Sequence, residues 1–182
     1  DITKKDFWLK GMSELAEENL TRSMNALITL DDETIKEVYD VEENINFLNH
    51  AITDYLVKIN QSTLPIKDLE SYGYLFHVVN DIERIGDYAT NFDEIAKKKF
   101  DSDITFSESA VIEFETIKDA ITEILRLTIE AMTDENDYVA KRIEPLEEVI
   151  DDMVLLLQNR HRDRLCKGIC SINGGLLFLE AL

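Results

Sequence analysis

The chain has 182 residues, of which 45% are hydrophobic, and its 38 acidic and 19 basic residues give a formal net charge of −19. The apolar content is that of a folded domain, and the negative charge argues against binding nucleic acid or an anionic membrane through a broad basic surface. Only 6 Gly and 2 Pro occur, too few for the many turns of an all-β protein. Long helices with short connections are therefore expected.

Apolar side chains recur at alternating steps of three and four residues, which is the spacing of one face of an α-helix. In chain order, this pattern predicts helices at about 3–29, 32–60, 67–98, 107–133, 136–167 and 172–182. Pro145 lies inside the fifth and should kink or restart that helix. Apolar rows of this length are typical of helices that pack nearly in line, so the sequence predicts an all-α bundle.

The longest polar break, residues 97–109, separates the third predicted helix from the fourth. It divides the chain into two units of three helices, at 1–100 and 101–182. An internal repeat supports this division, because VEENI (41–45) resembles LEEVI (146–150) and each lies in the second helix of its unit. The sixth helix is barely begun at Leu182, so we expect the second bundle to be incomplete and the chain to be a fragment of a larger protein.

Glu83 and Asp87 are four residues apart and therefore project from the same face of the third predicted helix. Like charges at this spacing weaken a helix slightly, and a solvent-exposed pair is the simplest interpretation. Three features favour a binding site: the pair flanks the apolar row, Gly86 indicates a close approach by another backbone or a ligand, and the pattern recurs. The recurrences are Glu147 with Asp151 in the fifth helix and Glu42 with Asn46 in the second.

Carboxylates on the second and third helices would meet where these helices pack, and a divalent or trivalent cation would offset their repulsion. Oxygen ligands favour hard ions such as Mg, Ca, Mn or ferric iron. A di-iron enzyme is not expected, because such bundles use Glu-x-x-His pairs and the residues three before His50, His77 and His161 are Phe47, Tyr74 and Gln158. No phosphate-binding Gly loop or nucleophile elbow occurs either, so the sequence points away from catalysis.

Two short motifs near the end of the fifth helix have alternative interpretations. HRDRL (161–165) is either a basic cluster that interacts with the negative end of the helix dipole or an anion site. Cys166 and Cys170 do not have the spacing of a zinc or thioredoxin motif. We interpret them as small packing residues rather than as metal ligands or a redox pair.

NDIERIGDYATNFDEIA (80–96) resembles the signature of the PhoU family of phosphate-uptake regulators, roughly nLERIGDhatNIaE. The resemblance implies a tandem of two three-helix bundles, with a metal-binding Glu/Asp-x-x-x-Asp motif on the second and third helices of each. Such motifs often bind multinuclear clusters. Asn46 replaces the second acid of the first motif, and the fourth motif is expected beyond Leu182. The metal ligands that the resemblance implies are Glu42, Glu83, Asp87, Glu147 and Asp151.

RLCKGICSINGGLLFLEAL (164–182) resembles a segment in the cytoplasmic tails of bacterial sodium/phosphate cotransporters. This implies a regulatory domain on the cytoplasmic face of the membrane that binds Fe, Mn, Mg, Ca or Zn and tunes phosphate uptake. Its partners would be the transporter's membrane domain or other phosphate-uptake components, together with a second copy in a homodimer, and no nucleic acid. Two alternatives stay open: a free-standing PhoU-type regulator of a phosphate ABC transporter and its sensor kinase, and a metal-free helical module that binds basic segments of a partner.

Overall fold

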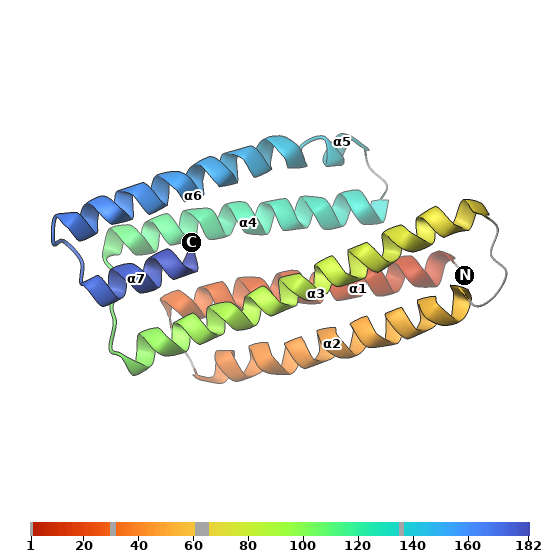
Figure 1. The fold of residues 1–182 in the computed structure, drawn as a ribbon, viewed down its shortest axis with the longest axis horizontal. Coiled ribbons are helices and arrows are strands. Elements are labelled where there is room, and N and C mark those ends of the chain that lie inside the picture. Colours follow the sequence, from red (N-terminus) through yellow and green to blue (C-terminus); the bar gives the residue numbers. More distant parts are fainter. Residues whose placement is uncertain (1, 30–31, 61–65, 135–136) are drawn as a thin grey trace.

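The computed structural model describes residues 2–29, 32–60, 66–134 and 137–182, and within these ranges the regular structure is entirely helical (Figure 1). The predicted all-α fold is therefore confirmed. None of the described helices combines the length and the apolar character that crossing a membrane requires. The helices are α1 (Ile2–Ile28), α2 (Asp32–Asn60), α3 (Ile66–Asp101), α4 (Glu108–Asp134), α5 (Asp137–Ala140), α6 (Ile143–Cys166) and α7 (Ile172–Ala181).

The predicted fifth helix, 136–167, is observed as two helices rather than one. α5 ends at Ala140, a turn follows, and α6 begins at Ile143. Pro145 lies in the first turn of α6, where its missing N–H has no intrahelical partner to lose. The expectation that the helix would kink or restart at Pro145 is confirmed, and the new helix begins two residues before the proline. Residue 136, the expected first residue of that helix, lies outside the described ranges.

The long helices run nearly side by side (Figure 1). α1, α2 and α3 pack against one another, α4 packs against α6, and α1 also packs against α4. One cluster of buried apolar side chains lies within the first three helices and includes Met12, Ile45 and Val79. A larger cluster extends from α1, α2 and α3 into α4, α6 and α7. Because this core crosses residue 100, the division into two units at that point stays a prediction.

The short helix α7 joins the two halves, because it contacts both α3 and α6. Ser171 caps its start, with the Gly174 N–H donating to Ser171 Oγ at 3.1 Å. Gly175 faces α6 so closely that a Cβ there would lie 2.2 Å from Cδ2 of Leu165. The missing side chain therefore allows α7 to bring Phe178 into the shared core.

We expect Gly175→Ala to destabilise the protein by about 2 kcal/mol, because Leu165 or α7 must move to accommodate the new methyl group. Gly11→Ala in α1 is the matched control. A Cβ at Gly11 meets nothing within 4 Å, so helix propensity alone should make this variant more stable by up to about 1 kcal/mol. Urea unfolding of both variants measures the difference, and equal effects would contradict this explanation of Gly175.

Candidate functional site

The three acids predicted on α2 and α3 lie near one another at the contact between these helices. Glu42 and Glu83 are half-buried and Asp87 is exposed. Burial first, and then the charges of Asp87 and Glu42, raise the pKa of Glu83 above its usual range, while His50 has the opposite effect. The negative charge of Glu42 on α2 therefore acts on Glu83 of α3. We call Glu42, Glu83 and Asp87 the acidic cluster.

Close packing between α2 and α3 explains this juxtaposition. Ile45 is fully buried, and a Cβ at Gly86 would lie 3.3 Å from Cγ2 of Ile45. The close approach that Gly86 indicated is therefore made by a side chain of α2. Glu83 and Asp87 lie on either side of Gly86 in the sequence of α3, near this contact with α2.

Asn46 is paired with Glu42 instead of supplying a second acid. Its Nδ2 donates a short hydrogen bond to Glu42 Oε1, as the spacing of one helical turn allows. Among the described side chains, no Lys or Arg forms an ion pair with Glu42, Glu83 or Asp87. The cluster thus has an excess of negative charge that the described part of the protein does not neutralise.

The acidic cluster has the donor chemistry of a site for a hard cation, because carboxylate and amide oxygens are the ligands that such ions prefer. In the described residues, however, no three His, Cys, Asp or Glu side chains converge closely enough to hold a metal ion. Glu42 is turned toward Asn46. This hydrogen bond uses Oε1 of Glu42, so Oε2 is the oxygen of Glu42 that would bind an ion shared with Glu83.

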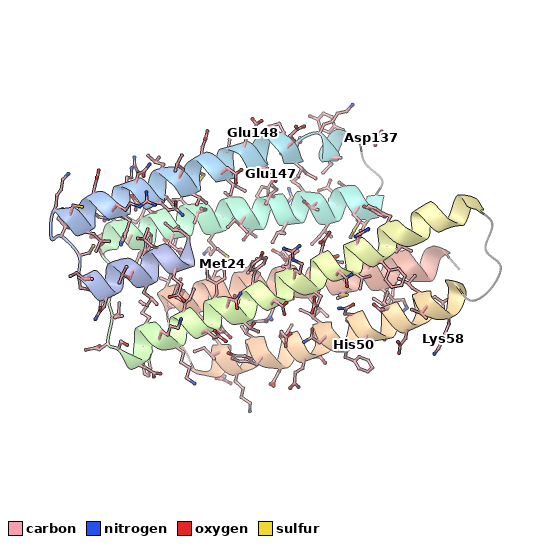
Figure 2. All side chains as sticks on the ribbon, in the orientation of Figure 1. Met24, His50, Lys58, Asp137, Glu147 and Glu148 are labelled. Atoms are coloured by element: carbon pink, nitrogen blue, oxygen red, sulfur yellow. The ribbon has the colours of Figure 1, made fainter. Side chains whose placement is uncertain are left out.

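The other predicted ligands, Glu147 and Asp151, lie elsewhere. Both are exposed on α6, and Figure 2 shows Glu147 on the opposite side of the molecule from His50 of α2. The structure therefore does not bring this pair into the acidic cluster. Whether it contributes to a second site stays a prediction.

Sequence reasoning missed Asp93 of α3. Its side chain is completely buried, and neither carboxylate oxygen has a hydrogen-bond partner within the described structure. Burial raises the pKa of Asp93 from 3.8 to about 7. The signal was present in the sequence, because Asp93 lies four residues after Ala89 and three before Ala96, and both alanines belong to the buried face.

Tyr39 of α2 extends the same acidic environment. Burial first, and then Glu94, Asp93 and Glu42, raise the pKa of Tyr39. Negative charge therefore continues along the contact between α2 and α3 beyond the acidic cluster. Tyr39 is itself exposed, so it presents a phenol group at the surface of α2 within this acidic environment.

HRDRL takes part in an ion-pair network between α4 and α6. The guanidinium of Arg164 donates to both carboxylate oxygens of Glu113, at 3.1 and 2.5 Å. Arg160 lies 3.6 Å from the same carboxylate. His161 is buried, and its Nδ1 lies 3.2 Å from Nη2 of Arg164. Arg160, His161 and Arg164 therefore already interact with one another or with Glu113 of the same protein. We call Glu113, Arg160, His161 and Arg164 the Glu113 network.

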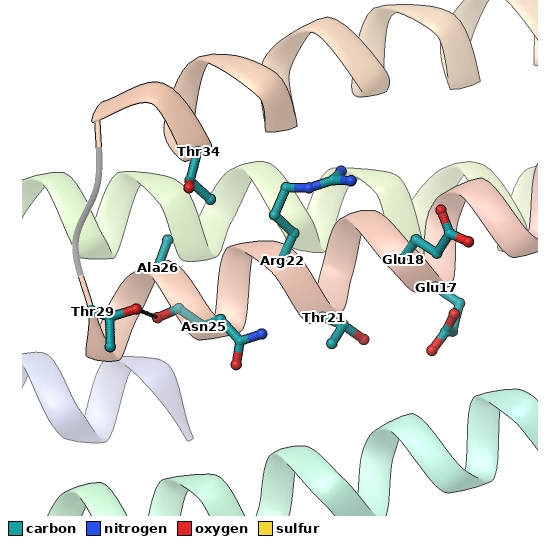
Figure 3. Close-up of a pocket in the computed structure, with 8 residues that line it drawn as sticks. All are labelled: Glu17, Glu18, Thr21, Arg22, Asn25, Ala26, Thr29 and Thr34. Carbon is teal, nitrogen blue, oxygen red and sulfur yellow. Dashed lines mark hydrogen bonds between the residues drawn. The ribbon is translucent and has the colours of Figure 1, made fainter.

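Two cavities lie away from the acidic cluster. A polar cavity of about 470 Å³ follows α1 toward α2 (Figure 3), and Arg22 in it is bound to Asn19 at 3.1 Å and to Glu37 at 3.4 Å. A second cavity, of about 440 Å³, has mainly apolar walls from α1, α3, α4, α5 and α6. Neither is lined by Glu42, Glu83 or Asp87.

Comparisons with known proteins show which family and which fold this chain resembles. Residues 9–96 match the family described as the PhoU domain, and this segment contains Glu42, Glu83 and Asp87. The structure of PhoU from Pseudomonas aeruginosa superimposes with a TM-score of 0.90 at 20% sequence identity, covering 99% of this chain and 86% of that chain. A comparison with curated proteins gives no match. The chain thus has the fold of PhoU, and its first half, residues 9–96, matches the PhoU domain.

Proposed function

We propose that this protein is a PhoU-like regulatory domain that binds metal ions and tunes phosphate uptake. The observation that carries the proposal is the acidic cluster, which lies within the segment that matches the PhoU domain. Its carboxylates come from two helices. Burial, and then repulsion from Asp87 and Glu42, raise the pKa of Glu83. A cation would relieve this repulsion. We assign no catalytic residue, and the role is regulatory rather than enzymatic.

Glu42, Glu83 and Asp87 would hold the ion, and the amide oxygen of Asn46 could add a neutral ligand. Such a set suits Mn, Fe, Mg or Ca better than soft metals. Because Asn46 stands where the motif of α2 would have a second acid, this motif carries one negative charge less. It should therefore bind a metal ion more weakly than a motif with two acids. Glu147 and Asp151 supply only two carboxylates on one helix, so we propose weaker metal binding there.

We expect Mn²⁺ or Fe³⁺ to raise the melting temperature of the wild-type protein. An ion at a concentration one hundred times its dissociation constant stabilises the folded state by about 2.7 kcal/mol, which corresponds to several degrees for a domain of this size. The double variant Glu83→Gln/Asp87→Asn should lose this response. Without metal it should be at least as stable as the wild type, because repulsion with Glu42 is removed.

The matched control is Glu147→Gln/Asp151→Asn, which removes the same two charges from the exposed face of α6. This control should keep most of the metal response. If metals leave the wild-type melting curve unchanged, metal binding by the acidic cluster is wrong. In that case a module that binds basic partner segments through its acidic surface becomes the better hypothesis.

The finer proposal is that this domain belongs to a sodium-dependent phosphate transporter and lies on the cytoplasmic face of the membrane. A free-standing regulator of a phosphate ABC transporter fits the same fold. The gene discriminates between them: several encoded apolar runs of about 20 residues upstream of Asp1 would support the transporter. An independent start codon close to Asp1 would support the free-standing regulator.

A further inference from the structure

α7 packs against α6 at His161, next to the contact between α6 and α4. This side chain is 2% exposed, and its ring stacks on that of Phe178 with the centroids 4.5 Å apart and the planes inclined by 25°. Phe178 is fully buried and also meets Phe106 edge to face at 5.4 Å. The position of α7 therefore depends directly on the environment of the imidazole.

The Glu113 network requires a neutral His161. A guanidinium group can only donate hydrogen bonds, so the 3.2 Å contact between Arg164 and Nδ1 of His161 makes Nδ1 the acceptor. The proton of the neutral ring is then on Nε2. Arg164 cannot turn away freely, because both of its terminal nitrogens are held by Glu113. Protonation of Nδ1 would abolish this hydrogen bond and place two cations in contact.

The charges around the ring give an imidazolium ion little compensation. α6 contributes Arg160 and Arg164, and α4 contributes the single carboxylate of Glu113, which both arginines already approach. α7 presents the Phe178 ring to His161, while its Glu180 is 2.6 Å from Lys98 of α3. A protonated His161 would add a buried positive charge next to Arg164, whose carboxylate partner Glu113 is already shared with the more exposed Arg160.

We propose that docking of α7 is sensitive to protonation: α7 stays on α6 while His161 is neutral, and protonation of His161 releases it. Since α7 also contacts α3 through Lys98 and Glu180, its release would loosen the connection between the two halves of the fold. Acidification would thus change how freely α4 and α6 move relative to the first three helices.

The direction of the pH dependence follows from the environment of the ring. Burial first, and then Arg164, lower the pKa of His161, while Glu113 and the Gly175 backbone partly oppose them. The neutral form is therefore favoured in the folded state. Its contribution to stability is complete above the ordinary histidine pKa of about 6.5 and is lost as the pH falls below that value.

Hydrogen exchange of the α7 amides, corrected for the intrinsic effect of pH, tests the proposal. From pH 7.5 to pH 5.0 we expect protection of residues 172–181 to fall at least tenfold more than that of α2. His161→Phe keeps an aromatic ring against Phe178 and cannot be protonated, so it should remove most of this difference. His77→Phe, at an exposed position on α3, is the matched control and should behave as the wild type.

Nitrogen chemical shifts of His161 in the wild-type protein give a second readout that does not depend on a variant folding. They should show the Nε2–H tautomer at pH 7.5 and titration together with the loss of α7 protection. The proposal is overturned if α7 is equally protected at both pH values. It is also overturned if His161 becomes protonated while α7 stays protected, or if His161→Phe shows the wild-type pH dependence.

Discussion

Asp93→Asn should stabilise the folded protein at neutral pH and flatten the dependence of its stability on pH. The wild-type carboxyl group is completely buried without a hydrogen-bond donor, and burial raises its pKa from 3.8 to about 7. Between these values, the folded state binds a proton that the unfolded state has released. The free energy of unfolding therefore falls as the pH rises from about 4 to about 7.

The expected size of this effect is large for one side chain. A difference of about three pH units between the folded and unfolded pKa corresponds to about 4 kcal/mol, which is a substantial fraction of the 5–15 kcal/mol by which domains are typically stable. Asparagine has nearly the same shape and cannot ionise. The stability difference between Asp93→Asn and the wild type should therefore grow by about 1.4 kcal/mol per pH unit until about pH 7.

Urea unfolding between pH 5 and pH 8 measures this difference. Glu94→Gln is the matched control, because Glu94 is the next residue of α3 but is exposed, and its effect should vary little with pH. Two outcomes would contradict a buried, protonated Asp93. One is an Asp93→Asn effect that is independent of pH, and the other is a wild-type stability that rises from pH 5 to pH 7 as steeply as the variant's.

Glu113→Gln should destabilise the protein by about 3 kcal/mol. Glu113 and Arg164 each keep only 13% of their side-chain surface exposed, and their contact of 2.5 Å joins α4 to α6. Removing one partner of such a pair leaves the other charge poorly solvated, which typically costs about 3–5 kcal/mol at fully buried sites. Arg160 and His161 would also lose the carboxylate that faces them.

The matched control is Glu123→Gln in α4, which removes a carboxylate from the exposed contacts of Arg126 at 2.9 Å. Exposed ion pairs contribute at most about 1 kcal/mol, so this variant should unfold at nearly the wild-type urea concentration. Equal losses for Glu113→Gln and Glu123→Gln would show that the Glu113 network does not hold α4 and α6 together. A more stable Glu113→Gln variant would contradict it outright.

Local sequence signals predicted the helices well, because the helical period and the effect of Pro145 act over a few residues. The Glu113–Arg164 pair could not be read in this way, since its members are 51 residues apart and meet only through the packing of α4 on α6. Asp93 was missed for a related reason. Its place on the apolar face is visible in the sequence, but its lack of a partner depends on which side chains of the neighbouring helices surround it.

The acidic cluster could be predicted from the sequence only in part. The spacing of Glu83 and Asp87 is local, and it was visible in the sequence together with Gly86. The position of Glu42 beside Glu83 depends on the register of α2 against α3; that these acids would meet was expected from the apolar rows of the two helices and from the resemblance to PhoU. The contact of Ile45 at Gly86 now provides the physical reason for that register.

Elemental analysis of protein purified without a chelator tests the central proposal most directly. We expect the wild type to carry Mn, Fe or another hard metal ion in roughly molar amount, since Glu42, Glu83 and Asp87 lack a basic partner among the described side chains. Glu83→Gln/Asp87→Asn should retain less than one tenth of it, and Glu147→Gln/Asp151→Asn most of it. Wild-type protein without metal, or equal metal in the wild type and the Glu83→Gln/Asp87→Asn variant, would contradict a metal site at the acidic cluster.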